Sequence, residues 1–242
     1  MSASLLDTVK KTILVPPHPA GIPFIIGGVI ATLVFYTFSE FLGGLALFFT
    51  LACLYFFRDP ERVTPDKDSL VVAAADGEIS SIVENATLPS EFAGMEGLED
   101  KRFTRISTFL SVLDVHVQRL PVSGKIIRKV YSPGKFLNAD LDKASEDNER
   151  CALLIETDDG HKVCVVQIAG LIARRILTDV REDQDSRTGA RYGIIRFGSR
   201  VDVYVPEGVS PLVCKGQRAI GGETVLADFD ADEPARSGSV IL

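Results

Sequence analysis

An apolar stretch near the N-terminus constrains this chain more than any other feature. Between residues 21 and 57 the only charged side chain is Glu40, which divides the stretch into halves at 21–39 and 41–57. Each half approaches the roughly 20 apolar residues that a helix needs to cross a bilayer. The pattern predicts a helical hairpin with Glu40 and Gly43-Gly44 in its turn. A hairpin buried in a soluble core is less favoured, because a core helix is seldom apolar on every side.

The charges that flank the hairpin predict its orientation. Lys10 and Lys11 precede it, and Arg58 and Arg62 follow it. Whether the hairpin spans the membrane or dips into one leaflet stays open, but either arrangement returns the chain to its starting side, which the positive-inside tendency places in the cytoplasm. A cleavable signal peptide is disfavoured, because the apolar stretch is too long and begins too late. We expect residues 1–62 to associate with the cell membrane.

Beyond Pro60 the apolar pattern changes to short extended runs between Gly and Pro residues. Such runs predict a mainly β domain over residues 63–242, so the whole chain is of mixed α+β class. The run before Asp76-Gly77 and the run after it resemble a β-hairpin. The glycine turns near the C-terminus resemble those of barrel-sandwich domains, and we expect that architecture. The runs with the clearest strand pattern are 70–75, 78–83, 103–110, 112–120, 152–156 and 162–168.

A late strand carries the candidate chemistry. Val201, Val203 and Val205 alternate with polar residues, which predicts a strand with one buried face. Gly198-Ser199 breaks the approach to this strand, and taken alone it is best read as a bulge or a tight turn.

Charge and cysteine content narrow the function. The net charge of −7 argues against a nucleic-acid partner, because phosphate binding needs a basic surface. The four cysteines show no C-x-x-C spacing and no clustering with histidine, so neither a zinc site nor a disulfide framework is expected. We predict no metal site.

Four segments together carry a family resemblance: 56–62 (Phe-Phe-Arg-Asp-Pro-Glu-Arg), 73–77 (Ala-Ala-Ala-Asp-Gly), 109–124 and 197–199 (Phe-Gly-Ser). In this order and spacing they resemble the pyruvoyl-dependent phosphatidylserine decarboxylases in their short bacterial form. The resemblance implies conversion of phosphatidylserine in the bilayer to phosphatidylethanolamine and CO2, in phospholipid biosynthesis. It also implies that the substrate amine forms a Schiff base with a pyruvoyl group, which acts as an electron sink.

The resemblance further implies that the chain makes this cofactor from itself. The Ser199 hydroxyl attacks the carbonyl of Gly198, and the chain is cut into a large fragment, 1–198, and a small one, 199–242. The two fragments stay associated, and the pyruvoyl group derives from Ser199. No metal or external cofactor is required, and the oligomeric state is left open, a homo-oligomer included.

Further site residues follow from the matched motifs. Asp76 matches an aspartate that assists self-cleavage, and His116 matches a histidine that serves decarboxylation. An acid, an imidazole and a hydroxyl are the parts of an activated nucleophile. Asp114 should face the same side of its strand as His116 and tune it. Where longer family members carry a second histidine, this chain has Arg119, so either His116 serves both steps or Arg119 stabilises charge while another group acts as base.

Other interpretations remain. Arg58, Arg62, Arg174 and Arg175 could bind a lipid phosphate, but surface arginines are common and we leave them outside the predicted site. A non-catalytic membrane adaptor would explain a hairpin followed by a barrel-sandwich module, but not the joint presence of Asp76, His116 and Gly198-Ser199. A pyruvoyl enzyme acting on a soluble amino acid is disfavoured by the apolar hairpin.

Overall fold

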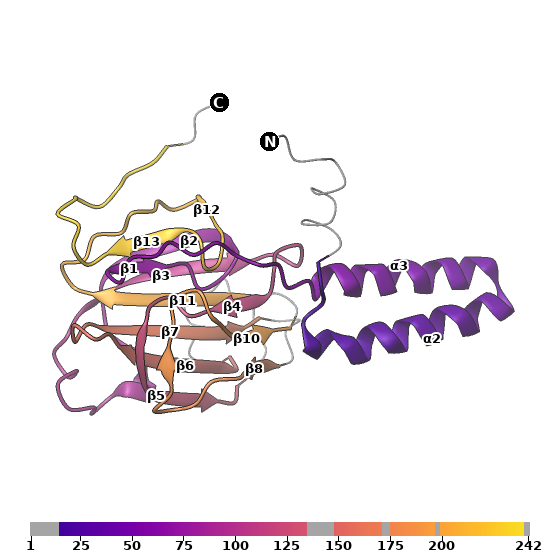
Figure 1. Cartoon of the computed structure of the whole chain (residues 1–242), viewed down its shortest axis with the longest axis horizontal. Helices are drawn as coiled ribbons and strands as arrows, with labels where there is room; N and C mark the ends of the chain where they lie inside the picture. Colours follow the sequence, from indigo (N-terminus) through magenta and orange to yellow (C-terminus); the bar gives the residue numbers. More distant parts are fainter. Residues whose placement is uncertain (1–14, 135–147, 171–174, 197–198, 240–242) are drawn as a thin grey trace. The chain divides into compact units, whose positions relative to one another are not determined.

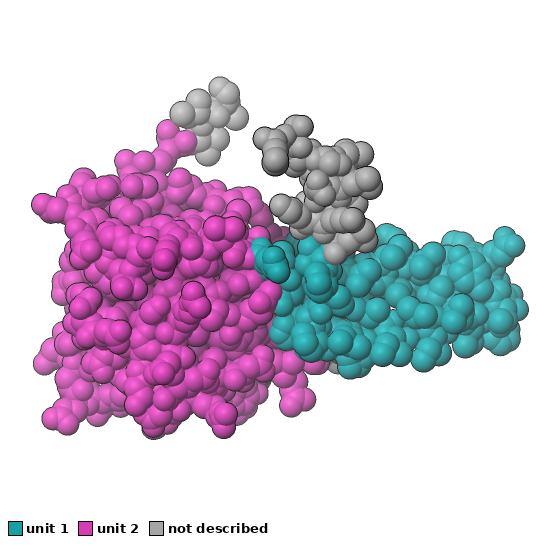
Figure 2. Space-filling model, in the orientation of Figure 1, with its two compact units in different colours: residues 1–61 teal, residues 62–242 magenta. Residues whose placement is uncertain are grey.

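The computed structural model describes residues 15–134, 148–170, 175–196 and 199–239. The chain forms two units, residues 1–61 and residues 62–242, which are coloured separately in Figure 2. The first unit contains helices and the second contains strands (Figure 1). Each is described by itself.

The first unit contains the predicted helical hairpin. A 3-10 turn, η1 (Pro19–Gly21), leads into α2 (Ile22–Phe38), and α3 (Glu40–Phe56) follows after the single residue Ser39. The prediction that Gly43-Gly44 lies in the turn is wrong, because both glycines are inside α3. Each helix has 17 residues and is therefore about 25 Å long.

Small and hydroxyl-bearing residues line the contact between the two helices. The Thr32 and Thr50 hydroxyls lie 3.2 Å apart and are buried. A Cβ on Gly28 would lie 2.6 Å from the Thr50 Oγ1, and a Cβ on Gly43 would collide with the ring of Tyr36. Glycine at these two positions therefore lets the helices approach closely.

The outer surface of the hairpin is apolar. Leu33 is 66% exposed and Phe48 is 65% exposed, although both are large hydrophobic side chains. The segment 19–38 is long and apolar enough to cross a membrane, whereas α3 is apolar but shorter. By length and composition the hairpin is therefore suited to association with a membrane.

The second unit is built from antiparallel strands, which confirms the mainly β prediction. A short 3-10 turn, η2 (Ser90–Phe92), interrupts the long loop between β2 and β3. The strands are β1 (Leu70–Val72), β2 (Gly77–Ala86), β3 (Phe103–Leu110), β4 (Val117–Arg119), β5 (Gly124–Ser132), β6 (Arg150–Glu156), β7 (Lys162–Ala169), β8 (Ile176–Thr178), β9 (Asp185–Ser186), β10 (Arg191–Ile195), β11 (Ser199–Pro206), β12 (Arg218–Ala219) and β13 (Val225–Asp228).

The main sheet is curled and has the order β12-β2-β3-β11-β7-β6-β5-β9 (Figure 1). A smaller sheet has the order β4-β10-β8, and β1 pairs with β13. The hairpin predicted around residues 157–161 is confirmed, because β6 and β7 pair in register across it. In contrast, β1 and β2 do not pair with each other, so the hairpin predicted around Asp76-Gly77 is wrong.

Apolar side chains are buried on both faces of the main sheet. One face shares a large core with the smaller sheet and includes Leu153, Val165 and Val201. The other face carries a second cluster, which includes Leu154 and Tyr204 and is partly covered by residues 88–98. This arrangement buries both faces of the central strands of the main sheet, β3, β11, β7 and β6.

Strand β11 departs from the prediction of one buried face. Its residues from Ser199 to Val205 are all buried, including the polar ones that alternate with the valines. Arg200 and Asp202 lie on the second face, where two guanidinium nitrogens contact the two carboxylate oxygens at 2.8 Å each. Alternation of this kind predicts that the polar residues face water. Here the ion pair between Arg200 and Asp202 allows both side chains to be buried.

Candidate active site

The ends of neighbouring strands bring Ser199 and Gly77, the residue after Asp76, to the same end of the main sheet. Ser199 begins β11 and lies opposite Leu110, which ends β3, and opposite Ala169, which ends β7. Gly77 begins β2 on the far side of β3, and any Cβ on it would collide with the carbonyl of Phe109. Adjacent strands lie about 4.8 Å apart, so the Gly77 backbone lies about 10 Å from that of Ser199.

Ser199 is buried, with no exposed surface. Its Oγ has no hydrogen-bond partner within the part of the chain that the structure describes. By alternation with Val201, its side chain faces the large core. The other residue of the predicted cleavage site, Gly198, lies outside the described residues.

His116 is also fully buried. Its Nδ1 lies 2.9 Å from the carbonyl oxygen of Asp114, and its own carbonyl accepts a hydrogen bond from the Ile195 N–H at 3.3 Å. A carbonyl oxygen can only accept, so Nδ1 must carry the proton and donate it. In the neutral ring this leaves the lone pair on Nε2, which is the atom able to act as a base.

Asp114 contacts His116 in a way that the sequence did not predict. Residues 112–114 form a turn, Val115 and His116 are irregular, and only Val117–Arg119 of the predicted 112–120 run is β. The carboxylate accepts a hydrogen bond from the Ser111 N–H at 2.8 Å and pairs with Arg218. Burial raises the pKa of Asp114, but the Ser111 and Arg218 contacts outweigh it and hold that pKa below its ordinary value. The backbone carbonyl of Asp114, rather than its carboxylate, makes the contact with the imidazole.

Asp76 lies between β1 and β2, and both of its carboxylate oxygens are bound. Oδ2 lies 2.6 Å from the Arg62 Nη2, and Oδ1 accepts the Gly221 N–H at 2.8 Å. The side chains of Arg62 and Asp76 are 14% and 15% exposed. The carboxylate is therefore fixed in position near the edge of the sheet.

Arg119 ends β4 and is buried. Its guanidinium donates to the Gly189 carbonyl at 2.8 Å, and its backbone N–H donates to the Ala74 carbonyl at 2.8 Å. The second contact places Arg119 beside the segment that leads to Asp76. A Cβ on Gly222 would lie 2.7 Å from the Arg119 Cδ, so the side chain is closely packed.

Two arginines in this region were not predicted as site residues. Arg62 contacts Asp76, and Arg218 contacts Asp114. Arg62 is 14 residues from its partner and Arg218 is 104 residues from its partner. The motif at 56–62 was the only signal for Arg62, and no local pattern marks Arg218.

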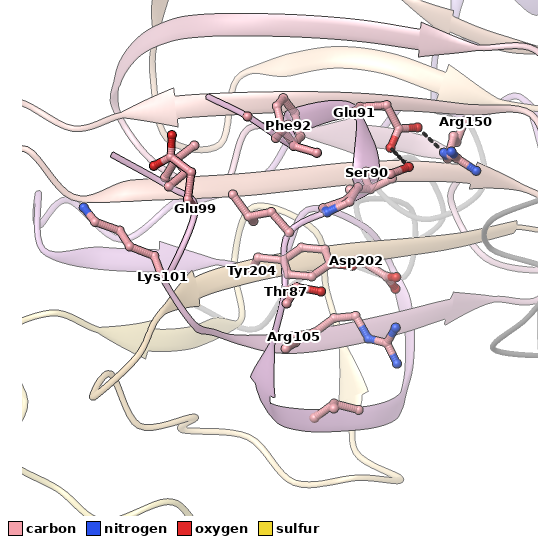
Figure 3. A pocket seen from close by; sticks show the side chains of 18 of the residues that line it. Thr87, Ser90, Glu91, Phe92, Glu99, Lys101, Arg105, Arg150, Asp202 and Tyr204 are labelled. Atoms are coloured by element: carbon pink, nitrogen blue, oxygen red, sulfur yellow. Dashed lines mark hydrogen bonds and ion pairs between the residues drawn. The ribbon is translucent and has the colours of Figure 1, made fainter. Parts of the chain in front are cut away.

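A cavity of about 900 Å³, shown in Figure 3, is lined by residues of the second face of the main sheet. Its walls include Arg105, Asp202 and Tyr204, together with Arg150, which pairs with Glu91. Asp202 and Tyr204 alternate along β11 with the residues that share a face with Ser199. The cavity is therefore separate from the candidate active site. Within the described ranges, no three His, Cys, Asp or Glu side chains gather as metal ligands.

Comparison with known proteins confirms the family resemblance. A sequence model described as phosphatidylserine decarboxylase matches residues 49–227. The chain is 57% identical over 226 residues to a phosphatidylserine decarboxylase proenzyme of Granulibacter bethesdensis, covering 93% of this chain and 90% of that protein. Proteins with the same description from Cereibacter sphaeroides and Beijerinckia indica are each 50% identical, over 239 and 231 residues, and cover 99% and 96% of this chain and 99% and 97% of their own lengths.

Proposed function

Because this chain belongs to the phosphatidylserine decarboxylase family, we propose that it removes the carboxyl group from the serine headgroup of phosphatidylserine. The products are CO2 and phosphatidylethanolamine, and the reaction belongs to phospholipid biosynthesis. We further propose that the chain is a proenzyme that converts Ser199 into a covalent pyruvoyl group. The observation that carries this proposal is the position of Ser199: the serine of the matched Gly-Ser pair begins β11 fully buried, and its hydroxyl has no partner among the described residues.

Ser199 fits the role of precursor. In the proposed processing its Oγ attacks the Gly198 carbonyl carbon, and the peptide bond to the Ser199 nitrogen becomes an ester. Loss of the Ser199 α-proton then breaks the ester and frees the Gly198 carboxylate. Hydrolysis releases ammonia and leaves a ketone at the new chain end. Residues 1–198 and 199–242 become the two fragments, which stay together because β11 pairs on both sides with strands of the large fragment.

We assign proton transfer to His116. His116 Nε2 is the proposed base or acid, because its Nδ1 is committed to the Asp114 carbonyl. Asp114 holds the turn that carries His116 through its contacts with Ser111 and Arg218. Asp76 assists self-cleavage, and Arg119 stabilises developing charge. A pyruvoyl ketone supplies the electron sink that the carbanion left by loss of CO2 requires.

The helical hairpin supports action at a membrane. A diacyl substrate keeps its acyl chains in the bilayer, so an anchored catalytic unit meets the headgroup without extracting the lipid. We propose that the hairpin anchors the chain in the cell membrane and that residues 62–242 lie on the cytoplasmic side. Lys10, Lys11 and Arg58, which flank the hairpin, carry the charge on which this orientation rests.

The first experiment is a denaturing mass spectrum of the full-length protein beside Ser199→Ala and Ser107→Ala. Ser107 is a matched control, because it is also fully buried and its hydroxyl also lacks a partner in the described structure. The wild type and Ser107→Ala should appear as two fragments divided before residue 199, and Ser199→Ala should stay intact. Incubation with phosphatidylserine vesicles should convert serine headgroups to ethanolamine only in the two cleaved proteins. Three intact chains and an unchanged headgroup would instead favour the adaptor.

A further inference from the structure

The β unit begins at Arg62, and we call its first three residues, Arg62–Thr64, the strap. Each makes a contact. Arg62 pairs with Asp76, and the Val63 N–H donates to a Glu223 carboxylate oxygen at 3.0 Å. Thr64 packs against Gly189, where a Cβ would collide with the Thr64 Oγ1. Gly189 has a φ of +77°, which also favours glycine.

The Arg62 contact fixes the orientation of the Asp76 carboxylate. A guanidinium nitrogen lies 2.6 Å from Oδ2, while the Gly221 N–H binds Oδ1. With both oxygens held, the carboxylate cannot rotate without breaking a charge-assisted hydrogen bond. Arg62 is mostly buried, so it is poorly placed for the lipid phosphate that the sequence allowed.

The groups that hold Asp76 come from both sides of the proposed cut. Arg62 belongs to the large fragment, whereas Gly221 belongs to the small one. Glu223, which binds the Val63 N–H of the strap, also belongs to the small fragment. The strap is therefore bound to the segment that becomes the small fragment, through Val63 and Glu223. Its other end reaches Gly189, whose carbonyl accepts from the Arg119 guanidinium.

We propose that Arg62 is a positioning residue for self-processing, which acts by holding the Asp76 carboxylate in place, and that the strap holds Arg62. This inference rests on the proposed function. A misplaced reacting or assisting group costs up to about 100-fold in rate, so loss of Arg62 should slow self-cleavage by about 10- to 100-fold.

The test follows cleavage of the full chain during cell-free synthesis in the presence of lipid vesicles. The variants are Arg62→Ala, Arg62→Lys and, as a matched control, Lys67→Ala. Lys67 lies in the same connecting segment and pairs with Asp228 at 2.7 Å, so its removal also breaks an ion pair to an aspartate. Arg62→Ala should be slow and Arg62→Lys intermediate. Lys67→Ala should match the wild type.

Chemical rescue separates positioning from general damage to the fold. Millimolar methylguanidinium should restore part of the rate to Arg62→Ala and should not change Lys67→Ala, whereas equimolar urea should restore nothing. Cleavage of Arg62→Ala at the wild-type rate would overturn the inference and leave the proposed function intact. A slow Arg62→Ala that neither lysine nor methylguanidinium improves would also overturn it, because the effect would then be structural. A wild type that never cleaves would instead refute the proposed function.

Discussion

The helical hairpin and the β unit place apolar and polar residues in opposite positions. In the hairpin, Leu33 and Phe48 face outward, while the hydroxyls of Thr32 and Thr50 meet inside. In the β unit, leucines such as Leu153 have no exposed surface. This difference is what the proposed membrane location of the hairpin predicts. Lipid gives helices no reason to bury apolar side chains, so small residues and hydroxyls would pair them, whereas water drives apolar burial in the strands.

The β unit buries charged side chains, which costs desolvation free energy, whereas the hairpin does not. The central strand β11 is covered on both faces, so its charged residues are inside the protein and must be paired there. Arg200 and Asp202 satisfy each other through two contacts. The hairpin has a single charged residue, Glu40, at the start of α3 beside the turn. The predictions below test this contrast.

Asp202→Ala should destabilise the β unit more than any other substitution considered below. Removing the carboxylate leaves the buried Arg200 charge without the partner that both guanidinium contacts use, which should lower the free energy of unfolding by about 3–5 kcal/mol. The measurement is urea unfolding of the β unit in the uncleaved Ser199→Ala protein. Tyrosine fluorescence reports it, because the chain has no Trp and Tyr192 and Tyr204 are buried.

A double variant controls for this effect. Arg200→Met combined with Asp202→Leu removes both charges and should be more stable than Asp202→Ala alone. If Asp202→Ala instead unfolds at the same urea concentration as its parent, the pair is not what allows this strand to be covered on both faces.

The same substitution in the two units should give opposite results. Leu153→Ala creates a cavity in the core and should lower the free energy of unfolding of the β unit by about 2–5 kcal/mol. It should leave vesicle binding unchanged. Leu33→Ala, at an exposed position, should change that stability by less than about 0.5 kcal/mol. It should weaken vesicle binding by about 1–2 kcal/mol, because less apolar surface enters the lipid. Equal vesicle binding by the parent and Leu33→Ala would contradict the membrane role of that face.

Acid should lower the stability of the β unit more than that of the hairpin. The folded structure holds the pKa of Asp114 below its ordinary value of 3.8. The contribution of the ionised Asp114 carboxylate to the free energy of unfolding is therefore fully present above pH 3.8. It is lost as the pH falls through the lower pKa of the folded state. At neutral pH, Asp114→Asn should be less stable than the parent by about 1–3 kcal/mol.

The decisive comparison is between two urea series, one at neutral pH and one below pH 3.8. The difference between parent and Asp114→Asn should shrink in the acidic series. Helical circular dichroism from the detergent-bound hairpin should not follow this change. A difference that stays constant with pH would mean that the Ser111 and Arg218 contacts do not favour the charged carboxylate.

The elements that the sequence predicts best depend on local pattern. The hairpin follows from an unbroken apolar run, and β3 has the predicted bounds, Phe103–Leu110. The β6–β7 hairpin follows from a turn between two alternating runs. In each case the information lies within the element and its neighbour along the chain.

The failures involve partners that are distant in sequence. Asp76-Gly77 is a common turn pair, but β1 pairs with β13, which lies at the other end of the β unit. The alternation in β11 does not reveal that Arg200 and Asp202 neutralise each other under a covering loop. Motif resemblance selected Asp76, His116 and Ser199, whose roles stay predictions, but no periodicity could join Arg62 to Asp76. Gly198, the other predicted residue of the cleavage site, lies outside the described residues.

The complete burial of Ser199 has a consequence for the kind of chain end that can form there. Ordinary hydrolysis before this residue would create an α-amino group, which is largely protonated near neutral pH. An ammonium ion at a position without exposed surface carries a desolvation penalty of several kcal/mol unless it is paired. A keto end carries no charge, so this desolvation penalty does not arise. The burial of Ser199 is therefore consistent with the proposed cut, which ends in a neutral acyl group rather than an amine.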